Sequence, residues 1–231
     1  MKTILIIKCG ETFPEIKQKH GDFEEWIINR SNLPTNVFKV INLTAGEQLR
    51  HPSEYMAAII TGSQANVDQP LPWMEPLKKW IITARYSNVP VLGICFGHQI
   101  IAEALGGRVI LNPAGQSVGI VKILLTMEGK KNDIYKNTGN SFESFVHHNY
   151  IVENLHSDAQ VLATNEKQVI YSFKIGKMYG IQFHPEFTPE IMQHYHDILK
   201  TKDANKIRVN IKSSFKNDSI ISNFLDLSLI L

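Results

Sequence analysis

The 231-residue sequence contains only two cysteines, Cys9 and Cys95, and no apolar run that approaches the length of a membrane span. Its first eight residues form a short apolar run that meets a charge at once, which is typical of a first strand rather than an export signal. These features exclude a disulfide framework and give no support for membrane insertion. We therefore expect a location in a reducing cytoplasm.

Charge and ligand-binding motifs are equally sparse. The formal net charge is only +2, and no basic block with interleaved aromatic residues suggests nucleic-acid binding. The sequence has no H-E-x-x-H or C-x-x-C set, which argues against a metal site. No phosphate-binding glycine loop follows the first strand-like segment, which argues against a nucleotide. We therefore expect neither metal nor cofactor, and no nucleic-acid partner.

The first half of the chain alternates strand-like and helix-like segments. Such alternation predicts βαβ units and a parallel sheet with helices on both faces. The expected fold class is α/β, with a doubly wound, mostly parallel central sheet. The expected strands are 3–8, 37–42, 55–60 and 89–94, and the expected helices are 14–30 and 73–86.

The second half contains short strand-like segments with little helix between them, followed by two helices. We expect antiparallel strands that add to the central sheet and form a small flanking sheet. Residues 1–231 are predicted to form one domain, with a C-terminal helical extension at about 201–231 and a polar stretch at 201–218. The expected strands are 108–111, 118–126, 142–146, 160–164, 169–175 and 177–183, with a hairpin turn at 174–177 and helices at 188–200 and 219–229.

The stretch 89–107 is the most informative part of the sequence. An apolar run ends at Cys95, a helix-like pattern follows immediately, and Gly93 and Gly97 flank the cysteine at two residues on either side. This pattern is typical of a nucleophile elbow with cysteine as the nucleophile. The thiol would sit at a helix N-terminus, which favours the thiolate. A buried, inert cysteine that closes a core strand is the alternative.

A second cluster lies at Gly180–Phe187, where a predicted strand ends just before His184 and Glu186. In an extended segment, residues at i and i+2 share a face, and Pro185 favours extended geometry at His184. A histidine can take the thiol proton and return it to a leaving amine, while a glutamate orients the ring. Alone, this tripeptide would fit a surface turn, but with the elbow it completes a nucleophile, base and orienting group.

An oxyanion hole is the remaining requirement for acyl transfer. The backbone N–H of Phe96, directly after the nucleophile, is one expected donor. The second is expected from Gly62, in a loop at the end of a neighbouring predicted strand, because glycine lets the backbone approach a ligand. An ordinary turn after a strand is the alternative for this loop.

The elbow G-I-C-F-G-H-Q and the strand end F-H-P-E resemble those of the class I glutamine amidotransferases of the Cys-His-Glu type. The resemblance covers most of the chain and implies a flavodoxin-like α/β fold. It also implies substrate contacts by Gln99, four residues after the nucleophile. The segment that contains His148, Asn149 and Tyr150 resembles the family segment that holds the amino-acid end of the substrate, with Tyr150 where one version has aspartate.

The resemblance implies hydrolysis of a γ-glutamyl amide through a Cys95 thioester, with release of glutamate and ammonia or an amine. Two subgroups fit: stand-alone proteins similar to the amidotransferase domain of GMP synthase, and γ-glutamyl peptidases that act on glutathione-like compounds. In the first case, a separate synthetase subunit would accept the ammonia. A non-catalytic ligand-sensing relative and a cysteine-based redox protein are further alternatives, although the His184–Glu186 pair argues against both.

Overall fold

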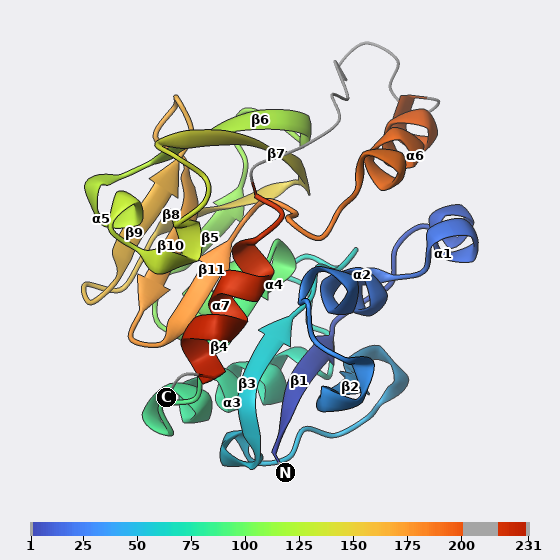
Figure 1. The fold of residues 1–231 in the computed structure, drawn as a ribbon, viewed down its shortest axis with the longest axis vertical. Coiled ribbons are helices and arrows are strands. Elements are labelled where there is room, and N and C mark those ends of the chain that lie inside the picture. Colours follow the sequence, from blue (N-terminus) through green and yellow to red (C-terminus); the bar gives the residue numbers. More distant parts are fainter. Residues whose placement is uncertain (1, 201–216, 230–231) are drawn as a thin grey trace.

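The computed structural model describes residues 2–200 and 217–229, which form an α/β structure around one mixed sheet (Figure 1). Its strands are β1 (Thr3–Lys8), β2 (Phe38–Asn42), β3 (Tyr55–Ile60), β4 (Val91–Ile94), β5 (Arg108–Leu111), β6 (Ser117–Leu125), β7 (Ser141–His148), β8 (Tyr150–Asn154), β9 (Gln160–Thr164), β10 (Ile170–Ile175) and β11 (Met178–Ile181). Its α-helices are α1 (Pro14–His20), α2 (Phe23–Arg30), α3 (Met74–Tyr86), α4 (Phe96–Ala104), α5 (Met127–Lys130), α6 (Pro189–Lys200) and α7 (Ile220–Leu229). Short 3₁₀ turns lie at Thr35–Val37, Leu43–Ala45, Pro52–Glu54 and Asp133–Tyr135.

Five adjacent strands form the parallel part of the sheet, in the order β2-β1-β3-β4-β11. Strand β1 shows why it is central: Ile4 and Ile6 pack into one apolar cluster, and Leu5 and Ile7 pack into another. Because alternate side chains point to opposite faces, both faces of this strand are covered. The doubly wound, mostly parallel sheet predicted from the sequence is therefore confirmed.

Helices cover the two faces as this pattern requires. Helices α3 and α4 contribute to the cluster that contains Leu5 and Ile7, while α2 and α7 contribute to the cluster that contains Ile4 and Ile6. In Figure 1, α7 crosses the sheet in front of β3, β4 and β11. Helices α1 and α6 lie beside each other, next to the carboxyl ends of the parallel strands. No helix among the described residues is both long enough and apolar enough to cross a membrane.

The antiparallel strands continue the same sheet in the order β11-β10-β9-β6-β7, and β5 and β8 pair beside them. The predicted hairpin joins β10 to β11, and Gly176 at its turn has a φ of 58°, a conformation that glycine adopts without strain. The added antiparallel strands are confirmed. The small sheet is not separate, however, because hydrogen bonds connect it to the central sheet.

The structure corrects several predicted boundaries. The helix expected at 14–30 is two helices, because Gly21 has a φ of 80° and the carboxylate of Asp22 caps the start of α2. Strand β8 was not predicted, and β7 is longer than the 142–146 expected for it. The final helix is present as α7, whereas 201–216 of the predicted extension lies outside the described residues.

Candidate active site

Cys95 stands at a sharp turn between strand β4 and helix α4. It has a φ of 54°, a left-handed conformation that is strained for a residue with a side chain. A Cβ added to Gly93 would overlap the backbone carbonyl of Gly97, and one added to Gly97 would overlap that of Ile60. Both glycines are therefore required by space, as the elbow pattern in the sequence predicts.

Three strand ends meet at this turn. In the parallel register, Ile60 of β3 pairs with Gly93, and Ile181 of β11 pairs with Ile94. The backbone N–H of Cys95 donates to the carbonyl oxygen of Ile181 at 2.8 Å. Since Gly62 follows β3 and His184 follows β11, their positions beside Cys95 follow from strand pairing. This is the carboxyl edge of the sheet, where α/β proteins build their sites.

Cys95, His184 and Glu186 lie together in the interior of this edge. His184 Nδ1 is 2.7 Å from Glu186 Oε1, and the imidazole also interacts with the Cys95 side chain. The exposed fractions of the three residues are 6%, 4% and 1%, respectively. A backbone hydrogen bond of 2.9 Å from His184 N–H to the Phe145 carbonyl ties this segment to β7. The structure thus brings together the three residues that the sequence predicted as catalytic.

Burial and neighbouring charges act in opposite directions on His184. Burial lowers the pKa of its imidazole, but the charges of Glu186 and Cys95, and hydrogen bonds to both, outweigh burial and raise the pKa from 6.5 to about 10. By contrast, burial lowers the pKa of His147 to about 4, and the charge of His184 adds to that effect. Two neighbouring histidines therefore carry different charges near neutral pH, and the protonated one faces the thiol.

The expected oxyanion donors are available. Within residues 2–200 and 217–229, neither the Gly62 N–H nor the Phe96 N–H has a hydrogen-bond partner. Gly62 borders the imidazole, since a Cβ built on it would lie 3.4 Å from His184 Cε1. Because buried backbone donors are nearly always paired, these two unpaired N–H groups, one directly after Cys95 and one beside the imidazole of His184, can bind a ligand oxygen.

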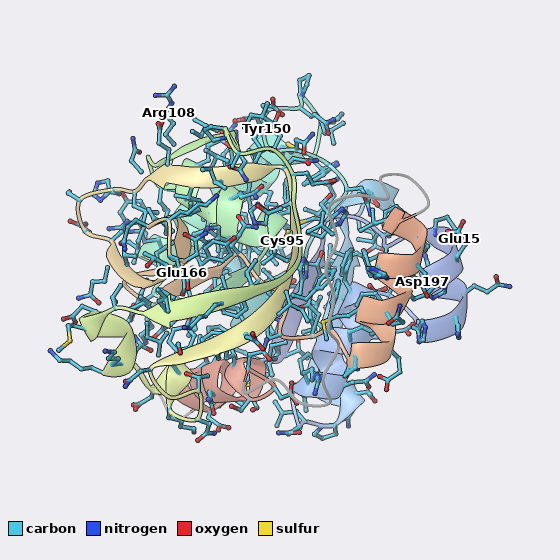
Figure 2. The ribbon with its side chains drawn as sticks, turned by 90° about the horizontal axis from the view of Figure 1, so that it is seen from above. Glu15, Cys95, Arg108, Tyr150, Glu166 and Asp197 are labelled. Carbon is cyan, nitrogen blue, oxygen red and sulfur yellow. The ribbon has the colours of Figure 1, made fainter. Side chains whose placement is uncertain are left out.

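A small pocket of about 50 Å³ opens over the thiol. Cys95 and Phe96 line this pocket together with the four candidate substrate residues, Gln99, His148, Asn149 and Tyr150. The rest of the lining consists of Ser63, Gln64, Ala65, Asn66 and His147. Figure 2 shows Cys95 near the centre of the molecule, whereas Glu15 and Asp197 lie at its rim. A larger cavity of about 610 Å³ lies between the 43–52 segment and α3, and its lining does not include the thiol.

Gln99 presents mainly an acceptor to this pocket. Its Nε2 donates to the Tyr150 carbonyl at 2.9 Å and to Gln182 Oε1 at 3.0 Å, which uses both amide hydrogens. His148 Nδ1 also lies 2.9 Å from the Tyr150 carbonyl, and burial lowers the pKa of His148 to about 4. Tyr150 is therefore held from two sides at the pocket wall.

Two polar contacts at the pocket were missed from the sequence. The Cys95 thiol lies 3.6 Å from the carbonyl oxygen of His147, which is a backbone contact without a sequence signature. The Tyr150 hydroxyl donates to Asp68 Oδ2 at 2.6 Å, although 82 residues separate them. A tyrosine in the substrate segment was visible in the sequence, but its carboxylate partner depends on loop geometry. No group of three or more His, Cys, Asp or Glu side chains in the described residues is arranged to bind a metal ion.

Comparison with known proteins decides the family. The sequence profile of the family described as glutamine amidotransferase class-I matches residues 20–202. The chain belongs to this family. A relative, named as a subunit of the glutamine-hydrolysing GMP synthase of Methanococcus vannielii, is 33% identical over 163 residues, which cover 70% of this chain and 79% of the relative. A glutamine amidotransferase-like protein of Schizosaccharomyces pombe is 25% identical over 229 residues, which cover 85% and 84% of the two chains.

Solved structures share the fold of this class I amidotransferase chain. A glutamine amidotransferase of Thermotoga maritima superposes with a TM-score of 0.76 at 21% identity, over 99% of this chain and 98% of that one. One from Methylobacillus flagellatus gives a TM-score of 0.73 at 16% identity, over 99% and 94%. The family and fold expected from the elbow and the strand end are confirmed. At the level of the family, the activity is hydrolysis of glutamine and transfer of its ammonia.

Proposed function

We propose that the chain hydrolyses a γ-glutamyl amide with Cys95 as nucleophile. The Cys95 thiolate, whose proton lies on His184 Nε2, attacks the side-chain carbonyl carbon. The C–N bond then breaks, His184 protonates the departing ammonia or amine, and a thioester remains on the sulfur. Water attacks the thioester with His184, now neutral, as base, which releases glutamate and restores the Cys95 thiolate beside a protonated His184.

The observation that carries this proposal is the buried contact chain from Cys95 through His184 to Glu186. The carboxylate engages Nδ1 and leaves Nε2 for the sulfur, which is the arrangement that a general base requires. The free N–H groups of Gly62 and Phe96 would bind the oxyanion, and one such donor typically lowers the barrier by about 3 kcal/mol.

Glutamine is the first substrate that we propose, with γ-glutamyl peptides such as glutathione-like compounds as the alternative. The amino-acid end would lie against Gln99, His148, Asn149 and Tyr150, since these residues share the pocket with the thiol. Asp68, which is reached through the Tyr150 hydroxyl, would supply negative charge near the α-ammonium. Among the described residues, no cationic side chain forms an ion pair with Asp68, so its charge is free to attract that group.

We further propose that the ammonia is used by a separate synthetase subunit. The support is the similarity to proteins that are named as single subunits of GMP synthase, from Methanococcus vannielii and Methanocaldococcus jannaschii. We also propose a reducing cytoplasmic location, because both cysteines are free and one of them would react as a thiol.

The test offers the purified chain glutamine, glutathione and γ-glutamyl dipeptides while glutamate release is measured. A Cys95→Ala variant serves as the control for contaminating activity, and a Cys9→Ala variant serves as the matched cysteine control. Release from glutamine that requires Cys95 supports the proposal, and preference for the peptides favours the alternative substrate. No release from any of them, with Cys95 open to alkylation, would contradict hydrolysis.

A further inference from the structure

The ring of Phe187 lies flat against the imidazole of His184. Their centroids are 4.3 Å apart, and the two planes are inclined by 27°. Phe187 is 4% exposed, so water does not separate the two rings. It directly follows Glu186, and the chain therefore places a carboxylate at the edge of the imidazole and an aromatic face against its plane.

Phe187 is itself held on its other sides by a group of aromatic rings, which we call the aromatic platform. Its members are Phe23 and Trp26 of α2, Phe145 of β7, Phe187, and Tyr195 of α6. The Phe187 centroid lies 4.9 Å from Tyr195, 5.2 Å from Trp26 and 5.4 Å from Phe145. Phe23 lies beside both Phe187 and His184, at 6.4 Å from each.

A polar network ties the platform to the edge of the sheet. Lys8, at the end of β1, donates to Asp22 Oδ2 at 2.8 Å, and Asp22 Oδ1 accepts from the backbone N–H of Thr12 at 2.9 Å. The Thr12 hydroxyl lies 2.5 Å from the Tyr195 hydroxyl, which links α6 to the same network. On another side, an Arg30 guanidinium N–H donates to the Phe187 carbonyl at 3.1 Å. The platform is therefore fixed from β1, α2 and α6 together.

We propose that Phe187 is a positioning residue for His184, whose ring face fixes the imidazole plane and stabilises its protonated form. The proposal rests on the role of His184 as general base in the function proposed above. An aromatic face carries negative potential, and a cation stacked on it in a desolvated site is stabilised. An imidazolium at this position would also keep its second N–H directed at the thiol, because rotation of the ring would lose contact with the face of Phe187.

Ordinary core packing is the competing explanation, and it makes a different prediction. A ring that only fills space should be replaceable by a ring of the same shape with altered electronics. A ring that stabilises a cation should not be replaceable in this way, because fluorination weakens the negative potential of the ring face while it nearly preserves the volume of the ring. The other ionisable groups coupled to His184 are Glu186, Cys95, His147 and His148, and a fluorinated ring at 187 changes none of them.

The experiment places 3,4,5-trifluorophenylalanine at position 187 of the full chain and follows the His184 imidazole by NMR of ¹³C-labelled histidine across pH. The signal is assigned by its loss in His184→Gln. The matched control carries the same residue at position 142, because Phe142 is a buried ring that packs against Tyr135 and Phe183.

We expect the His184 midpoint to fall by about 0.5 pH unit or more for the substitution at 187 and to stay within about 0.1 unit for the control. A Phe187→Leu variant, if folded by circular dichroism, should lower the midpoint by about one unit. An unchanged midpoint with fluorinated 187 would overturn the proposal and leave Phe187 as packing alone. Because the experiment measures the titration of His184 and not turnover, the proposal for Phe187 can fail while glutamine is still hydrolysed. It can also be supported in a chain that hydrolyses nothing.

Discussion

The Nδ1 atom of His184 lies 2.7 Å from Oε1 of Glu186, two residues further along the chain. The sequence predicts an extended segment here, but the extended geometry ends at the bridge of His184, because Pro185 and Glu186 form a turn that brings the carboxylate back to the imidazole. Within the described residues, Glu186 Oε2 has no hydrogen-bond partner, so the side-chain contact of this carboxylate is with the imidazole of His184. Both the charge and the orientation of His184 therefore depend on this pair.

Glu186→Gln removes the charge that helps to keep His184 protonated. We expect kcat for glutamine to fall by roughly 10²–10⁴-fold, because an amide neither fixes the tautomer nor supports the imidazolium. The alkaline limb of the activity should move from near pH 10 toward 6.5, since Glu186 is a main cause of the raised pKa of His184. A pH–rate profile measures both. Glu143→Gln, at an exposed position of β7, is the matched control and should behave as the parent chain does.

Stability should depend on pH through the same imidazole. The pKa of His184 is raised from 6.5 to about 10 in the folded chain, so the folded state retains a proton that the unfolded chain releases near pH 6.5. Its contribution is complete below pH 6.5 and is lost as the pH rises through about 10. The free energy of unfolding in urea should therefore fall more between pH 6.5 and pH 9.5 for the parent chain than for His184→Gln. An equal fall in the free energy of unfolding for the two chains would rule out the raised pKa of His184.

Gly97→Ala should damage the elbow, because the new methyl group would overlap the carbonyl of Ile60 in the adjacent strand. We expect a loss of about 1–3 kcal/mol in the free energy of unfolding, as overpacking usually causes. Gly62→Ala is the comparison, since its methyl group would meet only ordinary contacts at 3.4 Å and beyond. The free energy of unfolding of Gly62→Ala should lie within about 1 kcal/mol of that of the parent chain. The reverse order of stabilities would mean that the backbones at the elbow are not as close as described.

Asp68→Asn tests the amino-acid end of the substrate site. If the Asp68 carboxylate attracts the α-ammonium, KM for glutamine should rise by about tenfold with little change in kcat, because the interaction is the same in the ground and transition states. Tyr150→Phe should give a smaller rise in KM, since it only releases the Asp68 carboxylate from its hydroxyl partner. Glu166→Gln, at an exposed loop position, is the control. A fall in kcat at constant KM for Asp68→Asn would assign that residue a different role.

Much of the fold could be predicted because the strands are buried on both faces and the helices alternate with them. The break between α1 and α2 could not, since it depends on the conformation of Gly21 and on the cap by Asp22 within an otherwise helical pattern. Strand β8 was missed because its residues overlap the segment that was interpreted as a substrate loop. The local sequence pattern does not reveal whether this segment forms a strand, because that depends on its pairing with β5 and β10.

The grouping of Cys95, His184 and Glu186 could be anticipated, because each has local chemistry that strand ends bring to one edge. The partner of Tyr150 and the aromatic platform could not. Asp68 sits in a loop without periodicity, and Phe187 is an ordinary apolar residue in the sequence until it is seen against the imidazole. Contacts made across distant loops and helices carry no signature in either partner alone.

Covalent catalysis by Cys95 is best tested by mass spectrometry of the chain, quenched in acid during turnover of glutamine. We predict that the peptide containing Cys95 gains the mass of one γ-glutamyl group, and that neither Cys95→Ala nor the Cys9 peptide of the parent chain gains it. Glutamate release with Cys95 unmodified at every quench time, and with equal rates in Cys95→Ala, would contradict the thioester and the role of the elbow.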